Sequence, residues 1–165
     1  MNYIKITTAD IANGIGVRVT LWCSGCAHHC SGCQNPQTWD AAAGNPFVED
    51  TMQELLDLIR PNYIHGLTFS GGDPLFVQNR LIVGYICERV RKEFGDAKDI
   101  WMWTGYEWDD IKDWDHLKYV DVLVDGPYVE TQRDISLLWA GSRNQRVIDV
   151  KQSMKKNEIV LWKEN

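Results

Sequence analysis

The sequence contains no apolar run that approaches the length of a membrane-spanning helix. It also lacks the layout of a signal peptide, in which a positively charged start precedes an apolar stretch, because this chain begins MNYIK. These two absences argue against a membrane span and against secretion. We therefore expect a cytoplasmic protein that has no membrane partner.

Basic residues are scarce relative to acidic ones, with 17 Lys and Arg against 23 Asp and Glu and a formal net charge of −6. Proteins that bind nucleic acid usually present a basic surface to the phosphates, so we expect no nucleic-acid partner. Internal repeats, low-complexity segments and linker-like stretches are absent as well. We expect the 165 residues to form a single domain, 1–165, with a core of its own.

What the sequence does contain is a concentration of cysteine, since four of its five cysteines lie between Cys23 and Cys33. Cys26, Cys30 and Cys33 have the spacing C-x3-C-x2-C directly after an apolar run. Thiolates this close in sequence can converge on a soft metal centre, and an iron–sulfur cube usually takes four of them. Three thiolates would leave one iron able to bind a small molecule, as an open zinc site does.

Other interpretations of these cysteines stay open on the residues alone. A structural disulfide is disfavoured, because cytosolic thiols stay reduced. A zinc site is a stronger alternative, since Cys23 could supply a fourth thiolate and His28 or His29 could also serve as ligands. The remaining cysteine, Cys87, has no partner motif and is expected to be a structural thiol on a helix.

Strand-like and helix-like segments alternate along the chain, which predicts an α/β fold with a mainly parallel sheet. The predicted strands cover residues 3–7, 17–22, 65–69, 100–103, 119–124 and a last edge strand at 159–161. A closed eight-stranded barrel typically takes about 250 residues, so we expect an incomplete, open barrel of about five to six mainly parallel strands. Trp101 and Trp103 are expected to be bulky, buried strand residues.

Two helices are predicted from apolar residues that recur at helical spacing. The first presents one apolar face made of Met52, Leu55, Leu56 and Ile59. The second is longer, and its predicted inner face consists of Val77, Leu81, Ile82, Tyr85, Ile86 and Val90.

The predicted strand at 65–69 is followed by the turn Gly71-Gly72-Asp73-Pro74. One interpretation is structural: the glycines make the turn, and Asp73 caps a helix whose first residue is Pro74. The same geometry also exposes backbone groups at the carboxyl end of a strand, where α/β folds place their ligands. We expect this turn and the cysteine loop to share the carboxyl face of the sheet.

The cysteine loop and the Gly-Gly-Asp turn resemble the cluster loop and the GGE/GGD motif of the radical S-adenosylmethionine (SAM) enzymes. Within that superfamily, residues 10–150 resemble the activating enzymes of anaerobic ribonucleotide reductase. The matching features are the glycine-rich opening at 10–18, the N…TW pattern at 35–39, DIWMWTGY at 99–106 and W.GS.NQ at 139–145. Gly32 also fits this family, since many other radical SAM enzymes have an aromatic residue there.

The resemblance implies an open barrel of the radical SAM type and a cofactor site within it. Cys26, Cys30 and Cys33 would hold one 4Fe-4S cluster per chain. SAM would lie against residues of the cysteine loop and of the turn, namely Gly32, Cys33, Gln34, Gly71, Gly72 and Asp73.

The chemistry that the resemblance implies is reductive cleavage of SAM, which is carried out by the cofactors rather than by side chains. A 5′-deoxyadenosyl radical would remove hydrogen from a glycine of the large catalytic subunit of anaerobic ribonucleotide reductase. A low-potential donor such as flavodoxin would supply the electron. An activating enzyme of another glycyl-radical enzyme, such as pyruvate formate-lyase, an electron-transfer ferredoxin and a zinc-bound interaction module remain alternatives.

Five further residues have two interpretations each. Thr104 and Tyr106 follow a predicted strand and either form a turn or line the SAM pocket. Asp125 either caps the segment after it or faces the pocket. Arg143 and Arg146 are either exposed loop residues or contacts to SAM or the partner protein.

Overall fold

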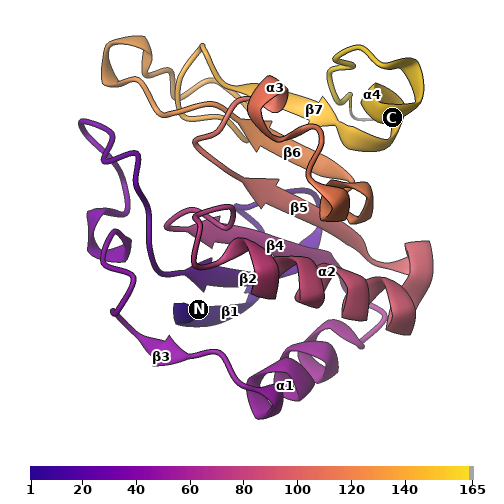
Figure 1. Cartoon of the computed structure of the whole chain (residues 1–165). Helices are drawn as coiled ribbons and strands as arrows, with labels where there is room; N and C mark the ends of the chain where they lie inside the picture. Colours follow the sequence, from indigo (N-terminus) through magenta and orange to yellow (C-terminus); the bar gives the residue numbers. More distant parts are fainter. Residues whose placement is uncertain (164–165) are drawn as a thin grey trace.

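The computed structural model describes residues 1–163 and contains a seven-stranded sheet (Figure 1). The strand order across the sheet is β3 (Asn45–Pro46), β1 (Asn2–Asp10), β2 (Val17–Cys23), β4 (Ile64–Gly71), β5 (Asp99–Trp103), β6 (Val122–Asp125) and β7 (Arg146–Asp149). The central strands β2, β4, β5 and β6 are parallel. The pairings at the two margins, among β1, β2 and β3 and between β6 and β7, are antiparallel.

The sheet therefore has more strands than the five to six of the sequence prediction, and its parallel part is confined to the centre. At one margin, residues 2–23 form a hairpin, which pairs its two strands antiparallel. At the other margin, the chain returns from β6 to β7 through the irregular segment 126–145 instead of a crossover helix. Both margins thus result from connections that reverse the chain direction.

In the described part of the chain, four α-helices accompany the sheet: α1 (Glu49–Ile59), α2 (Arg80–Phe94), α3 (Trp108–Ile111) and α4 (Val150–Lys156). In Figure 1, α1 and α2 lie on the same side of the sheet. Met52, Leu55 and Ile59 are fully buried and Leu56 is nearly so, which confirms the predicted face of α1. No helix among residues 1–163 is long and apolar enough to cross a membrane.

The predicted inner face of α2 is partly wrong. Val77, Leu81 and Tyr85 are exposed, by 59%, 73% and 38%, although the apolar pattern places them inside. The helix instead packs through Val83, Ile86, Cys87 and Val90, which have the spacing i, i+3, i+4, i+7. Apolar residues occupy two faces of this helix, so periodicity alone did not identify the buried one.

The sheet face opposite the helices carries a buried arginine. Successive side chains of a strand point to opposite faces, so Arg18 of β2 points away from the hydrophobic core that contains Val19. Arg18 is fully buried and donates hydrogen bonds to Thr68 Oγ1 at 2.7 Å and to the Ile15 carbonyl at 3.0 Å. Thr68 in turn donates to the Asn13 carbonyl at 2.7 Å. These bonds hold the glycine-rich loop at 11–16 over this face.

Candidate active site

A cavity of about 560 Å³ lies over the same face, towards the carboxyl ends of the parallel strands. Its walls come from five parts of the chain: the loop at 11–16, the cysteine loop after β2, the turns after β4 and β5, and the segment 126–145. This volume is within the roughly 300–1,000 Å³ of typical small-molecule sites. The location is also where α/β folds bind ligands.

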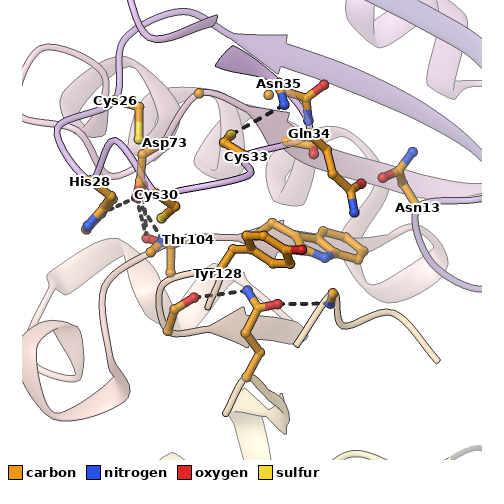
Figure 2. Close-up of a pocket in the computed structure, with 18 of the residues that line it drawn as sticks. Asn13, Cys26, His28, Cys30, Cys33, Gln34, Asn35, Asp73, Thr104 and Tyr128 are labelled. Carbon is orange, nitrogen blue, oxygen red and sulfur yellow. Dashed lines mark hydrogen bonds and ion pairs between the residues drawn. The ribbon is translucent and has the colours of Figure 1, made fainter. Parts of the chain in front are cut away.

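The three loop cysteines face this cavity together. Cys26, Cys30 and Cys33 are half-buried free thiols, and all three line the cavity (Figure 2). Burial raises the pKa of the Cys26 thiol, while backbone hydrogen bonds from His28 and His29 act against this increase. The backbone N–H of Asn35 donates to Cys33 Sγ at 3.3 Å, so one sulfur already has a protein donor.

The base of the cysteine loop is hydrogen-bonded to the Gly-Gly-Asp turn. The backbone N–H of Gly72 donates to the Cys23 carbonyl at 2.8 Å, and that of Asp73 donates to the Gly25 carbonyl at 2.8 Å. Gly25 N–H donates to the Thr38 carbonyl at 2.7 Å. The cysteine loop and the turn therefore form one backbone unit, although they are far apart in sequence.

Close backbone packing explains why glycine stands at position 72. A Cβ atom there would lie 2.5 Å from the Gly25 carbonyl oxygen and 3.0 Å from the Thr38 carbonyl oxygen. Both atoms belong to backbone, which cannot rotate away as a side chain can. Gly72 is thus required for the contact between the turn and the cysteine loop.

Asp73 does not cap a helix at Pro74, because α2 begins only at Arg80 and a series of turns lies between. The Asp73 side chain is buried and lies 2.8 Å from the Nε2 atom of His28 (Figure 2). The hydrogen bond from His28 to Asp73 raises the pKa of this imidazole, against the effect of its burial. Thr104 also donates to this carboxylate and is buried at the cavity wall.

The segment 126–145 covers the cavity on the side of β6 and β7. Its W.GS.NQ pattern has an internal structural role: Ser142 Oγ accepts from the Val129 N–H at 3.1 Å, and Asn144 donates to the Pro127 carbonyl at 2.7 Å. Gln145 lines the cavity, accepts from the Gly141 N–H at 2.9 Å and donates to the Gly126 carbonyl at 3.0 Å.

This segment also contacts the cysteine loop directly. Ser31 Oγ donates to Glu130 Oε2 at 2.7 Å. Gly32 has φ +68°, and a Cβ atom there would lie 2.7 Å from Glu130 Cδ. The segment and the loop thus meet above the ends of β4 and β5, which lie between them in the sheet.

Of the six residues expected to bind SAM, five line the cavity: Cys33, Gln34, Gly71, Gly72 and Asp73. Gly32 is not among the lining residues. Its positive φ and the close approach of the Glu130 side chain both favour glycine at this position. Their roles towards SAM stay predictions.

The structure also places the five residues for which the sequence left two interpretations open. Thr104 lines the cavity, whereas Tyr106 lies beside His28 outside it. Asp125 is fully buried, accepts from the Trp108 N–H at 2.8 Å and pairs with Arg146, so its role here is structural. Arg143 is exposed and pairs with Asp134 at 2.9 Å.

Sequence reasoning missed the aromatic wall of the cavity, which consists of Trp22, Trp39, Trp103, Tyr128 and Trp139. Trp101 is buried as predicted, but its strand neighbour Trp103 is only half-buried. The alternation of β2 and β5 would have placed Trp22 and Trp103 on the face opposite the helices. The alternation of side chains along a strand does not, however, predict that this sheet face encloses a cavity.

The donor set fits an iron–sulfur cluster. Among residues 1–163, no three His, Cys, Asp or Glu side chains gather around a point that could hold one metal ion. A cluster does not require this arrangement, because each thiolate would bind a different iron. Cys23 and Cys87 are free thiols as well, but both are fully buried away from the cavity lining.

Comparison with known proteins gives consistent results. A family model described as a 4Fe-4S single cluster domain matches residues 12–148. The anaerobic ribonucleoside-triphosphate reductase-activating protein of Enterobacteria phage T4 is 47% identical over 147 residues, which cover 89% of this chain and 93% of the relative. The proteins of the same name from Haemophilus influenzae and Escherichia coli K12 are 42% and 40% identical, over 88% and 89% of this chain and 96% and 97% of theirs.

Proposed function

We propose that this chain, which belongs to the family of anaerobic ribonucleoside-triphosphate reductase-activating proteins, activates an anaerobic ribonucleotide reductase by radical SAM chemistry. The family supports the reductase as the partner and a 4Fe-4S cluster as a cofactor. Cleavage of SAM, ligation of the cluster by three cysteines and formation of a glycyl radical are the further steps of the proposal.

The observation that carries the proposal is the shared cavity. Cys26, Cys30 and Cys33 line the same space as Gly71 and Gly72, and hydrogen bonds join the loop of the first group to the turn of the second. A ligand in this space can therefore contact a cluster and the exposed backbone of the turn together. Three thiolates would leave one iron open to such a ligand.

Cys26, Cys30 and Cys33 would hold the cluster, which would supply the one electron needed to split SAM into methionine and a 5′-deoxyadenosyl radical. That radical would take a hydrogen atom from a glycine of the reductase and so become 5′-deoxyadenosine. The chain's own residues hold the reactants in place and limit the access of water. The Asn35 N–H stabilises charge on the Cys33 sulfur, because a hydrogen bond to a ligating sulfur lowers the energy of the more negative state. Aromatic side chains such as Trp103 and Tyr128 give the rest of the cavity an apolar wall.

We also propose that the sheet is an incomplete barrel of the radical SAM type. The supporting features are its parallel centre, the burial of Arg18 and Trp101 on the face opposite the helices, and the cavity on that face. An open barrel suits a macromolecular substrate, because a loop of the partner protein can enter from the open side. The partner would be the large catalytic subunit, and a low-potential donor such as flavodoxin would reduce the cluster.

The test uses the full chain, purified and reconstituted with iron and sulfide without oxygen. Metal analysis should find iron and sulfide rather than zinc, and SAM with a reductant should yield 5′-deoxyadenosine. Adding the large reductase subunit from the same source should produce an organic radical by electron paramagnetic resonance and start nucleotide reduction. A reconstituted protein that leaves SAM intact would overturn the radical SAM proposal. A radical on pyruvate formate-lyase instead of the reductase would change the partner but not the chemistry.

A further inference from the structure

The carboxylate of Asp73 has no capacity left for a ligand. Its Oδ1 atom accepts from the Leu75 N–H at 2.8 Å and from Thr104 Oγ1 at 2.9 Å. Its Oδ2 atom accepts from the Gly105 N–H at 2.9 Å and lies 2.8 Å from His28 Nε2. An ionised carboxylate offers about four lone-pair positions, so these four donors saturate it. The side chain is also almost fully buried.

The imidazole of His28 is enclosed on several sides. Its ring packs edge-on against the ring of Tyr106, with centroids 4.7 Å apart and an interplanar angle of 78°. A Cβ atom on Gly105 would lie 2.4 Å from His28 Cδ2, so the absence of a side chain at position 105 makes room for the imidazole. An ionised carboxylate only accepts hydrogen bonds, so His28 donates to Asp73 through Nε2.

The position of His28 in the chain makes this contact consequential. The residue lies midway between Cys26 and Cys30, two positions from each. Fixing its ring fixes the backbone that separates these two thiols. The Asp73 carboxylate therefore connects the cysteine loop after β2 to the turn after β5, through His28 on one side and Thr104 and Gly105 on the other.

We propose that His28 and Asp73 are positioning residues, which together set the path of the cysteine loop between Cys26 and Cys30 for cluster binding, and that Asp73 acts on the loop through His28 rather than on SAM. This inference rests on the proposed function, since it assumes that the loop holds a cluster. It gives the third residue of the Gly-Gly-Asp turn a role in retaining the cluster.

The adjacent histidine provides a matched control. His29 stacks on Trp39, with centroids 4.6 Å apart and an interplanar angle of 20°, and it is not among the residues that line the cavity. The substitutions His28→Phe and His29→Phe both keep an aromatic ring in the same loop. Only His28→Phe removes a hydrogen bond to Asp73.

The first measurement is the rate at which an iron chelator removes the cluster from the reconstituted full-length protein without SAM. We expect about tenfold faster loss in His28→Phe, since one hydrogen bond to a charged group is lost, and a rate near wild type in His29→Phe. Asp73→Asn should lose its cluster at least as fast as His28→Phe, because an amide nitrogen in place of either oxygen faces two of the four donors. The variant that combines both substitutions should be no faster than Asp73→Asn alone, because His28→Phe then removes a contact that is already broken. Equal rates in His28→Phe and His29→Phe would overturn the proposal.

The second measurement is SAM binding, read from the change in the electron paramagnetic resonance spectrum of the reduced cluster during titration. We expect Asp73→Asn to alter SAM affinity no more than His28→Phe does. A tenfold or greater loss of affinity in Asp73→Asn alone would make Asp73 a direct SAM ligand and overturn the assignment. If Asp73→Asn does not fold, the comparison of the two phenylalanine variants decides the case.

These outcomes separate this inference from the proposed function. A wild-type protein that binds no cluster or cleaves no SAM contradicts the proposed function. A wild-type protein that does both, while His28→Phe holds its cluster as long as His29→Phe, contradicts only the positioning role.

Discussion

The five cysteines form two groups, whose side chains are identical but lie in different surroundings. Cys23 and Cys87 are fully buried and belong to the hydrophobic core. Burial raises the pKa of Cys23 and raises that of Cys87 to about 12. Cys26, Cys30 and Cys33 are half-buried and line the cavity.

This difference bears on which of the five identical side chains are available as ligands in the proposed site. A metal ligand must be the thiolate, and a thiol with a strongly raised pKa keeps its proton. Cys23 is only three residues from Cys26, yet it ends strand β2 with its side chain in the core. We therefore predict that Cys23 is not a ligand, although it lies close in sequence to the C-x3-C-x2-C motif.

The largest expected difference between the two groups is in bound iron, when a loop cysteine is removed. We expect Cys26→Ala, Cys30→Ala and Cys33→Ala each to lose nearly all of the bound iron after anaerobic reconstitution, because three thiolates are the minimum in the proposed site. Iron and sulfide analysis measures the outcome. A full cluster in any one of these variants would remove that cysteine from the ligand set.

The next largest effect is expected at Gly72, where the turn after β4 packs against the base of the cysteine loop. The Cβ atom of Gly72→Ala would press on the backbone of Gly25 and Thr38, which should destabilise the cluster-free protein by about 1–3 kcal/mol. Urea denaturation measures this change.

Gly141→Ala is the control, since the nearest atoms there belong to the Tyr128 side chain at 3.1 Å, which can move. Equal stability of the two variants would show that the turn is not tightly packed against the cysteine loop.

A smaller effect is expected in the core. Cys23→Ala and Cys87→Ala should each cost about 1–2 kcal/mol of stability, because each leaves a small void, and both should keep a complete cluster. The free energy of unfolding and the iron content, determined on the same preparations, give the two answers. Loss of iron in Cys23→Ala but not in Cys87→Ala would restore the interpretation with four thiolates.

The smallest effect, within any one pH unit, is a change of stability with pH that is expected only of the buried cysteines. Between about pH 9 and pH 12, the unfolded thiol of Cys87 loses its proton while the folded one keeps it, so the folded state binds more protons. Stability should then fall as the pH rises, by at most about 1.4 kcal/mol per pH unit for each buried thiol. Urea midpoints at increasing pH should decline less steeply for cluster-free Cys87→Ala than for the wild type. Identical slopes would contradict the raised pKa.

Local patterns in the sequence were sufficient for part of this structure. The buried face of α1 follows from one apolar stripe, and the expectation that the Gly-Gly-Asp turn and the cysteine loop share the carboxyl face of the sheet agrees with the cavity. In α2, two apolar faces compete, and the exposure of Leu81 was therefore not foreseen.

Contacts between distant segments were beyond the reach of these patterns. His28 meets Asp73 across 45 residues, and Ser31 meets Glu130 across 99. Both contacts depend on the order of strands in the sheet and on the path of irregular loops. The close approach of Glu130 to Gly32 depends on the same meeting of distant segments.

The contact between Ser31 and Glu130 also has a consequence for biosynthesis. Synthesis proceeds from the N-terminus, so the cysteine loop leaves the ribosome long before residue 130 exists. The turn that holds the base of the loop is made next, and the covering segment 126–145 is made later still. The partners that anchor the three thiols are therefore available during synthesis before the segment that covers them, and that later segment converts an open cysteine loop into a walled cavity.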